Sequence, residues 1–293
     1  MTEPRHDLQH DRFRVGEPAW IELCSAQPAS AEQFYAELLG WTVRHERLGA
    51  GTYRMCSVDD HDVAGITAAE VLRGERSHGW ITYFAVDDVD ASLDRALQLG
   101  AETVTAPRYL PAAGTGCTLV DPQGAVFGMY HGDARAGVET ANTPGSLCWT
   151  ELSTGEPRAS VEFYRGLFGY AAEHRDSVTG SRYSMLTLDG SPVAGILELE
   201  SEWPNVLPAR WAPYLAVADL SRAVDQVHAL GGSQVLGPVS SPHGVFHVVR
   251  DAEGHALDLI QLEEDLWISP RLTPSPAAPA APAAPTSTQV SDA

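Results

Sequence analysis

Apolar and polar residues alternate with two different periods along this chain, and the periods recur in a fixed order. Residues 20–24 (WIELC) alternate and predict a strand, whereas residues 31–38 place apolar side chains at helical spacing. Gly40 follows that segment and ends the predicted helix. Three more short segments complete the set and predict strands near residues 41–47, 53–58 and 63–67.

A second set of the same kind begins at Trp80. Its helix is predicted near Val89–Leu99 and ends at Gly100. The sequence DPQG from Asp121 predicts the turn of a hairpin between the last two strands. The first part of the chain therefore holds two units with the order strand, helix, strand, strand, strand (βαβββ).

The whole arrangement is repeated 129 residues later. The segment WIELCSAQPASAEQFYAELLGW from Trp20 matches WTELSTGEPRASVEFYRGLFGY from Trp149, with eight of the first 21 positions identical. A repeat of this length indicates a tandem duplication, so the chain is predicted to be an α+β protein with four βαβββ units. Shorter repeats keep the same order: Tyr-x-Met at Tyr53 and Tyr183, VAGI at Val63 and Val193, and DPQG at Asp121 against DAEG at Asp251.

Changes of composition mark the expected boundaries. The start of the chain is polar and lacks the apolar core of a secretion signal. The end is rich in Pro and Ala without periodicity, so both ends are expected to be disordered. The expected segments are a disordered N-terminus at 1–17, a first domain at 18–131, a linker at 132–147, a second domain at 148–265 and a disordered tail at 270–293.

This order of elements resembles a known family. The FYxxL segments that close with Gly-Trp or Gly-Tyr, the helix starts VDDVDAS and VADLSRA, and the two hairpins are similar to those of the vicinal oxygen chelate superfamily. That superfamily includes glyoxalases, extradiol dioxygenases, and the bleomycin and fosfomycin resistance proteins. The resemblance implies two tandem glyoxalase-like domains, whose βαβββ units pair into half-open barrels around a small molecule. It does not fix the activity, because such a scaffold carries very different chemistries.

The resemblance also implies where a metal would be bound. In metal-dependent members certain positions supply the metal ligands, and all but one of the corresponding positions here hold an indole, an aliphatic side chain or glycine. None of these groups can ligate a divalent cation. The usual metal site is therefore expected to be absent from both copies, and no cofactor is predicted. A shifted metal site that uses Glu22, Glu151 or a nearby His is the open alternative. The usual ligand positions hold Trp20 and Trp149, Ile81 and Ala212, residues of the two VAGI segments, and Gly128 and Asp258, of which only Asp258 has a metal-binding side chain.

Strand alternation places Trp20 and Glu22 on one face, and Trp149 and Glu151 on the equivalent face of the second copy. The resemblance makes this the concave face, and aromatic walls with a few polar groups are typical of a site for a flat or greasy organic molecule. Alternatively, the tryptophans are core residues, and the glutamates are buried acids paired with an arginine or with backbone amides. The expected ligand-binding residues are Trp20, Glu22, Tyr83, Tyr130, Trp149 and Tyr214.

The second copy has more acid–base capacity than the first. His247 stands where the first copy has Cys117, and Asp258 stands where it has Gly128. We expect Glu151, His247 and Asp258 to form the catalytic set of any enzyme, with Glu151 as a general base or as the anchor of a cationic ligand. The alternative is that His247 is an ordinary strand residue.

Charge and composition narrow the partners. The 39 acidic and 19 basic residues give a net charge of −20, which disfavours binding to nucleic acid or to an anionic membrane. All the basic residues are arginine, which excludes Schiff-base chemistry by lysine. No apolar run is long enough to span a membrane. Four cysteines without a CxxC pair are expected to be buried thiols of a cytoplasmic protein, which is a monomer with paired domains or a homodimer.

Two main classes of function remain open. The first is a sequestering or resistance protein that binds a small aromatic or cationic molecule without a metal. The second is a metal-independent isomerase, cyclase or epimerase of specialised metabolism that uses carboxylate and His acid–base chemistry. A metal-dependent lyase or dioxygenase with unusual ligands is a weaker third.

Overall fold

The computed structural model describes residues 13–48, 51–69, 79–110, 114–132, 137–176, 182–199 and 208–263. The expected tail at 270–293 and most of the expected disordered N-terminus lie outside these residues. The expectation of disorder does not hold for residues 13–17, because the Gly16 amide donates a 2.8 Å hydrogen bond to the carbonyl oxygen of Ala85 and Glu17 is buried. Among the described helices, none is long and apolar enough to cross a membrane.

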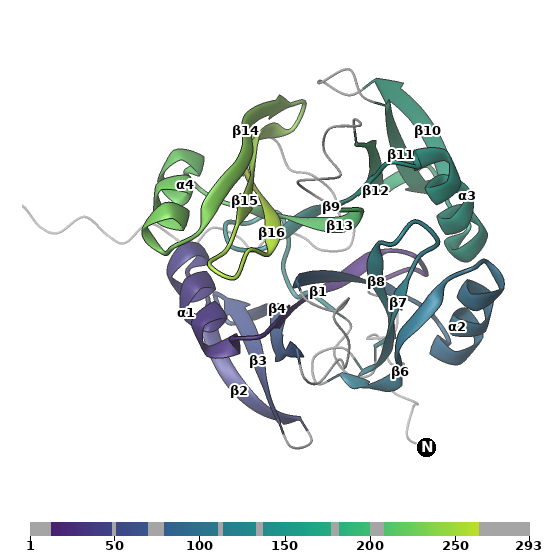
Figure 1. Ribbon diagram of the computed structural model, residues 1–293, viewed down its shortest axis with the longest axis horizontal. Coiled ribbons are helices and arrows are strands. Elements are labelled where there is room, and N and C mark those ends of the chain that lie inside the picture. Colours follow the sequence, from purple (N-terminus) through teal and green to yellow (C-terminus); the bar gives the residue numbers. More distant parts are fainter. Residues whose placement is uncertain are drawn as a thin grey trace, which may run out of the picture.

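The first copy, called the first module below, has eight strands and two helices in the predicted order (Figure 1). Its elements are β1 (Pro18–Ser25), α1 (Pro28–Leu39), β2 (Thr42–Leu48), β3 (Gly51–Val58), β4 (His61–Ala68), β5 (Gly79–Ala85), α2 (Val89–Gln98), β6 (Glu102–Leu110), β7 (Gly114–Val120) and β8 (Val126–His131).

The second module repeats this order, and the four predicted βαβββ units are confirmed. Its elements are β9 (Leu147–Thr154), α3 (Pro157–Phe168), β10 (Ala171–Asp176), β11 (Arg182–Leu188), β12 (Ser191–Glu198), β13 (Arg210–Ala216), α4 (Leu220–Ala229), β14 (Ser233–Ser241), β15 (Gly244–Arg250) and β16 (Ala256–Leu262).

Each module forms one curled sheet of eight strands. The strand order is β2-β3-β4-β1-β5-β8-β7-β6 in the first module and β10-β11-β12-β9-β13-β16-β15-β14 in the second. At the centre of each sheet the first strands of the two units, β1 with β5 and β9 with β13, pair antiparallel. The two units of a module are thus joined into one continuous sheet.

Local sequence signals begin and end the helices. α1 has a proline in its first turn and ends at Gly40, whose φ of 71° is left-handed and favours glycine. α2 begins at Asp88, whose carboxylate accepts a 2.9 Å hydrogen bond from the Ala91 amide. The second module repeats both devices, with Gly169 after α3 and Asp219 before α4.

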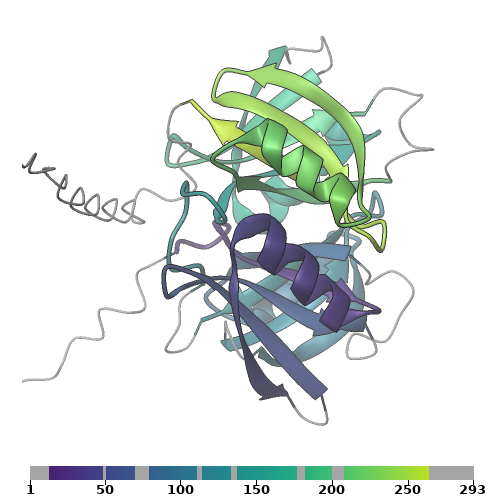
Figure 2. The same cartoon turned by 90° about the vertical axis from the view of Figure 1, so that its left-hand side faces the viewer.

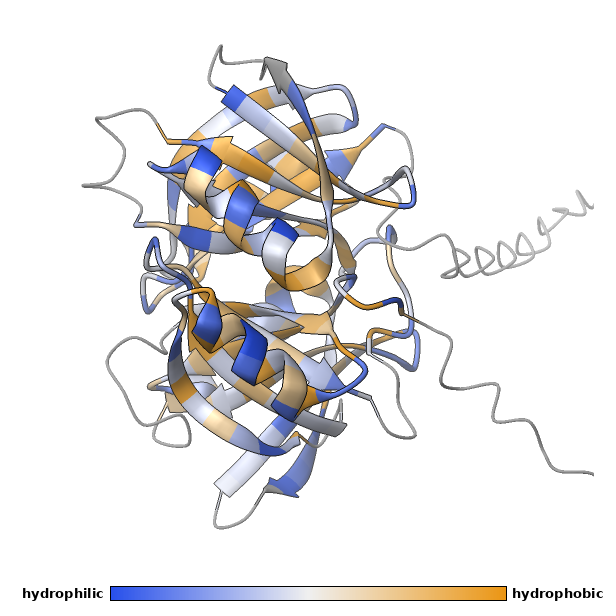
Figure 3. Ribbon diagram, turned by 90° about the vertical axis from the view of Figure 1, so that its right-hand side faces the viewer, coloured by the Kyte–Doolittle hydropathy of each residue, from blue (hydrophilic) through white to orange (hydrophobic). Residues whose placement is uncertain are grey.

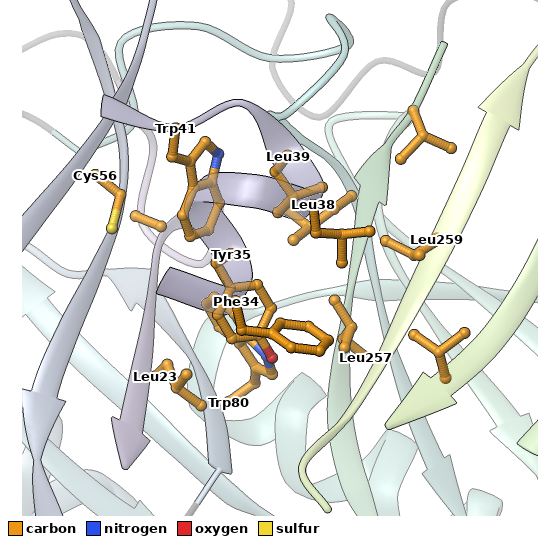
Figure 4. Packing of buried hydrophobic residues seen from close by; sticks show 14 of the residues in the cluster. Leu23, Phe34, Tyr35, Leu38, Leu39, Trp41, Cys56, Trp80, Leu257 and Leu259 are labelled. Atoms are coloured by element: carbon orange, nitrogen blue, oxygen red, sulfur yellow. The ribbon is translucent and has the colours of Figure 1, made fainter. Parts of the chain in front are cut away.

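The modules pack against each other through their helices. Figure 2 shows α1 beside α4, and Figure 3 shows α2 and α3 side by side with hydrophilic residues on their outer sides. Each pair of helices and the strands beneath it form one hydrophobic core that contains residues of both modules. Phe34 and Leu38 of α1, for example, belong to the same core as Leu257 and Leu259 of β16 (Figure 4). Neither module therefore completes its helix-side core alone.

Part of the segment between the modules packs against the first sheet. Val138 and Ala141 are buried in a cluster on the other face of the first sheet, the face without helices. The Val138 amide donates a 2.8 Å hydrogen bond to the carbonyl oxygen of Ala19. Part of the expected linker therefore completes the core of the first module.

Candidate functional site

Trp20 and Glu22 lie on the face of the first sheet without helices, here called the inner face. Their strand neighbours Ile21 and Leu23 point the other way into the helix-side core. On the adjacent strand, Tyr83 is the register partner of Trp20. The same register joins Tyr214 to Trp149 in the second module, so the predicted aromatic residues share an inner face in each module.

In the first module the inner face holds a buried chain of hydrogen bonds. The Trp20 Nε1 donates to the Tyr53 hydroxyl at 3.1 Å, and the Tyr53 hydroxyl is bonded to Glu22. The Tyr83 hydroxyl also donates to Glu22, at 3.4 Å to Oε1. Burial raises the pKa of Glu22, although the charge of Arg108 and the tyrosine hydrogen bonds oppose the shift.

The second module repeats this chain. Trp149 Nε1 donates to the Tyr183 hydroxyl at 3.3 Å, and the Tyr214 hydroxyl donates to Glu151 Oε1 at 3.3 Å. Burial, followed by the negative charge of Asp258, raises the pKa of Glu151 to about 8. The raised pKa favours the protonated form of the Glu151 carboxyl group, which can donate a hydrogen bond.

Tyr53 and Tyr183 were missed as site residues by the sequence analysis. The signal was present in the repeated Tyr-x-Met and VAGI segments. Gly65 and Gly195, the glycines of VAGI, lie on the strand beside each tyrosine, and a Cβ at either position would overlap the tyrosine hydroxyl. The two repeats are therefore halves of one feature, because the glycine makes the space that the hydroxyl occupies.

An arginine accompanies each buried glutamate, but from a different strand. In the first module Arg108 of β6 places Nη2 4.0 Å from Glu22 Oε1. In the second, Arg210 of β13 places Nη2 3.3 Å from Asp258 Oδ1, and its charge also acts on Glu151. An arginine partner for the glutamates was one of the sequence-based alternatives, but the repeat does not identify these two arginines, because they do not occupy equivalent positions.

The two inner faces differ in access. Trp20 and Glu22 are 0% exposed, and Tyr130 is also buried, so the first inner face is a closed core. Trp149 is 6% and Glu151 is 7% exposed. Two further aromatic residues of the second inner face, Tyr183 and Phe246, are half-buried. Among the described residues, the second inner face is therefore the less completely buried of the two.

The structure does not bring His247 to Glu151 and Asp258. His247 is the register partner of Leu259, and its alternating neighbours Val245 and Val249 pack in the helix-side core. Asp258 is the register partner of Tyr214 on the inner face. His247 therefore lies on the opposite face of the sheet, and the expectation of one set of three residues does not hold for it. Alternation could not reveal this, because both faces of the sheet are covered.

Comparison with known proteins supports the repeat. A family model described as a glyoxalase-like domain matches residues 20–129 and again residues 149–260. The chain belongs to the glyoxalase-like domain family. Its duplicated glyoxalase-like domain confirms the resemblance to the vicinal oxygen chelate superfamily.

Two relatives span nearly the whole of this glyoxalase-like protein. The anthracycline biosynthesis protein DnrV of Streptomyces peucetius is 31% identical over 266 residues, which cover 86% of this chain and 96% of DnrV. CFP32 of Mycobacterium tuberculosis is 29% identical over 257 residues, which cover 86% of this chain and 97% of CFP32.

Solved structures share the glyoxalase-like fold. A Mn(II)-bound glyoxalase from Novosphingobium aromaticivorans aligns with a TM-score of 0.58 at 17% identity, over 86% of this chain and 84% of the other. An extradiol ring-cleaving dioxygenase from B. fuscum aligns with a TM-score of 0.57 at 15% identity, over 90% and 76% of the two chains. At these identities the likeness concerns the fold alone.

The residues at the usual metal positions of this glyoxalase-like chain do not fit a metal. Within the described ranges, no group of three His, Cys, Asp or Glu residues is placed to hold one. Gly128 leaves space that the ring of Tyr83 fills, since a Cβ there would overlap that ring. In the second module the equivalent Asp258 is paired with Arg210. A guanidinium group thus stands where a cation would balance the carboxylate charge.

Proposed function

We propose that this glyoxalase-like protein binds a flat aromatic organic molecule on the inner face of its second module, without a metal. The observation that carries the proposal is the difference in access between two otherwise repeated inner faces. Trp149, Tyr214 and Glu151 are each 6–7% exposed, whereas their counterparts in the first module are 0% exposed. A closed core has no room for a ligand, so the partly open face is the one available for binding.

The chemistry of the second inner face suits an aromatic ligand. Phe246 packs edge-on against Tyr214, with ring centroids 5.3 Å apart, and Trp149 and Tyr183 lie on the same face. Aromatic side chains offer large, rigid stacking surfaces, and the carboxyl group of Glu151 adds a directional polar contact. The relationship to an anthracycline biosynthesis protein supports a role in specialised metabolism. Binding without turnover would make the protein a sequestering or resistance protein.

Quenching of tryptophan fluorescence by a planar probe, 1,2-dihydroxyanthraquinone, tests this proposal. We expect saturable quenching, and we expect the affinity for the probe to fall at least tenfold in Trp149→Phe. Trp20→Phe removes the same kind of Trp–Tyr hydrogen bond in the first module and discriminates between the two faces. Loss of binding in Trp20→Phe but not in Trp149→Phe, or the absence of saturable quenching, would overturn the proposal.

A second function is favoured by the neighbouring carboxyl groups of Glu151 and Asp258. Burial and the charge of Asp258 raise the pKa of Glu151 to about 8, which favours its protonated form. Burial also raises the pKa of Asp258, but the ion pair with Arg210 opposes that shift and favours its ionised form. One protonated and one ionised carboxyl group are the parts of a general acid and a general base. Such a pair could isomerise a ligand by moving a proton between two of its atoms.

Deuterium exchange separates binding from proton-transfer catalysis. The probe is 2-methyl-1,3-indanedione, a flat aromatic diketone with an acidic C–H bond, and NMR follows its exchange in D2O. An enzyme accelerates the exchange above buffer, and Glu151→Gln abolishes the acceleration while the probe still binds. Exchange at the buffer rate with the probe bound identifies a binding protein.

A further inference from the structure

We propose that Arg210 and Glu151 form a subsite for a negatively charged or strongly polarised oxygen atom of the ligand, such as a phenolate or enolate oxygen. This inference rests on the proposed function, since it describes the ligand held by the second inner face. The inferred ligand presents an oxygen acceptor, whereas the sequence led us to expect a cationic or aromatic ligand.

Arg210 has hydrogen-bonding capacity that the described residues do not use. Its Nη2 donates to Asp258 Oδ1 at 3.3 Å, whereas its Nε and Nη1 are buried and have no partner among the described residues. A buried donor without a partner destabilises the folded protein, so such groups in native proteins call for a ligand, a water or an ion. A ligand oxygen would satisfy this need with a charge-assisted hydrogen bond.

Glu151 contributes a donor rather than a negative charge. Its burial and the nearby Asp258 favour the protonated carboxyl group, and the Tyr214 hydroxyl lies against its Oε1. Asp258 is occupied by Arg210, so a ligand meets an uncharged acid and the free N–H groups of a guanidinium. These groups donate hydrogen bonds to an oxygen acceptor, and they present no free negative charge to a cation.

Comparison of the two modules supports the role of Arg210. Gly79 stands at the register position of Arg210 in the first module, opposite Cys24 where Arg210 is opposite Ser153. Arg108 approaches Glu22 there from a different strand, and it likewise has buried N–H groups without a hydrogen-bond partner among the described residues. Trp20, Glu22 and Tyr83 of that face are 0% exposed. The arginine of the second module is therefore no inherited part of the repeat, and it belongs to the more accessible inner face.

The experiment follows the ionisation of 1,2-dihydroxyanthraquinone by its visible absorption. Bound to the wild-type protein, the dye should ionise at least one pH unit below the free dye, because the subsite stabilises its phenolate. Arg210→Gln should abolish this shift and weaken binding of the ionised dye at least tenfold, while Arg210→Lys should keep part of the shift. Arg108→Gln, the matched change in the closed module, should leave the shift and the affinity unchanged. Thermal denaturation checks that each variant is folded.

Each outcome bears on the proposal. A bound dye that ionises at the same pH as the free dye, or an Arg210→Gln variant with the full shift, would overturn the oxygen subsite and leave the proposed function standing. Tighter binding of proflavine, a flat cationic dye, than of ionised 1,2-dihydroxyanthraquinone would also overturn it. Absence of binding by either dye would overturn both. The wild-type shift needs no variant, so the inference is testable even if Arg210→Gln does not fold.

Discussion

The Tyr35 hydroxyl group in α1 donates a 2.9 Å hydrogen bond to Asp251, which lies in a hairpin of the other module. Tyr164 of α3 donates to Asp121 at the same distance, in the opposite direction between the modules. Each tyrosine hydroxyl also accepts a hydrogen bond from an indole N–H, of Trp80 at 3.0 Å and of Trp211 at 2.7 Å. The repeated FY and DxxG sequences thus hold the two modules together.

Loss of either tyrosine hydroxyl should destabilise the whole chain. Tyr35→Phe leaves the Trp80 indole N–H without its acceptor and removes one of the hydrogen bonds to the Asp251 carboxylate, and Tyr164→Phe has the same effect on Trp211 and Asp121. We expect each change to lower the free energy of unfolding by about 1–3 kcal/mol in urea denaturation. Tyr109→Phe, at a residue that is 60% exposed, should change it by less than about 0.5 kcal/mol. Equal values for all three variants would show that the bridges contribute nothing.

One of the two bridges should depend on pH, because only the Asp251 hairpin carries a histidine at the fourth following position. Burial lowers the pKa of His255, but its hydrogen bond to Asp251 and the charges of Asp251 and Glu253 outweigh burial and raise it above 6.5. Burial likewise raises the pKa of Asp251, yet the contacts with His255 and Tyr35 lower it below 3.8. The stabilisation by the pair of His255 and Asp251 is therefore complete between pH 3.8 and pH 6.5, the ordinary pKa values of the two groups. It is lost as pH rises through the raised pKa of His255, and as pH falls through the lowered pKa of Asp251.

His255→Ala measures this dependence. The loss in free energy of unfolding should be larger at pH 5.5 than at pH 9, because the stabilisation by protonated His255 is lost as pH rises through its raised pKa. The other hairpin has Ala125 at the equivalent position and contributes no such slope. A loss that is the same at both pH values would contradict the ion pair.

Glu151 should make stability fall as pH rises. Burial and the charge of Asp258 raise its pKa from 4.5 to about 8, so the folded state binds the proton more tightly than the unfolded state does. The contribution of Glu151 to the free energy of unfolding is complete below pH 4.5 and is lost towards pH 8, with a slope of at most about 1.4 kcal/mol per pH unit. Glu151→Gln should flatten urea-derived stability over this range. Glu162→Gln, at an exposed residue of α3, should retain the slope.

Gly195 should tolerate no side chain. A Cβ there would overlap the Tyr183 hydroxyl, which Trp149 and Glu151 use as a partner. Gly195→Ala should lower the free energy of unfolding by about 1–3 kcal/mol and weaken probe binding, because overpacking displaces the tyrosine. Gly155→Ala is the control, since no atom lies within 4 Å of its Cβ position. A thermal midpoint of Gly195→Ala that equals that of Gly155→Ala would refute the packing argument.

Removal of metal should change neither the thermal stability of the protein nor its binding of the probe. The ring of Tyr83 fills the space at Gly128, and Arg210 is paired with Asp258, so these two positions, among the residues that the structure describes, do not suit a metal ligand. Dialysis against EDTA should leave both the thermal midpoint and the quenching by 1,2-dihydroxyanthraquinone unchanged. Elemental analysis that finds one equivalent of a transition metal, whose loss abolishes binding, would contradict this prediction.

Much of the fold was predictable because its signals are local. Alternation over residues 20–24 placed Trp20 and Glu22 on one face, and the 129-residue repeat gave the order of all four units. Tyr35 and Asp251 were also visible as repeated residues, but their contact was not, since it joins positions 216 residues apart. His247 was expected to act with Glu151 and Asp258, but it lies on the opposite face of the sheet. A strand covered on both sides shows alternation without showing which side is which.

The sequence by itself determined the duplicated βαβββ order, the helix boundaries and which residues of a strand share one face. Periodicity and capping residues act over a few residues, and the repeat shows the same signals twice. Only the tertiary structure decided that the first inner face is closed by Val138 and Ala141, and that Arg210 reaches Asp258 beside Glu151. Burial and the approach of charges depend on segments that are distant along the chain. The same Trp and Glu repeat therefore became a sealed core in one module and a partly open, acidic and aromatic face in the other.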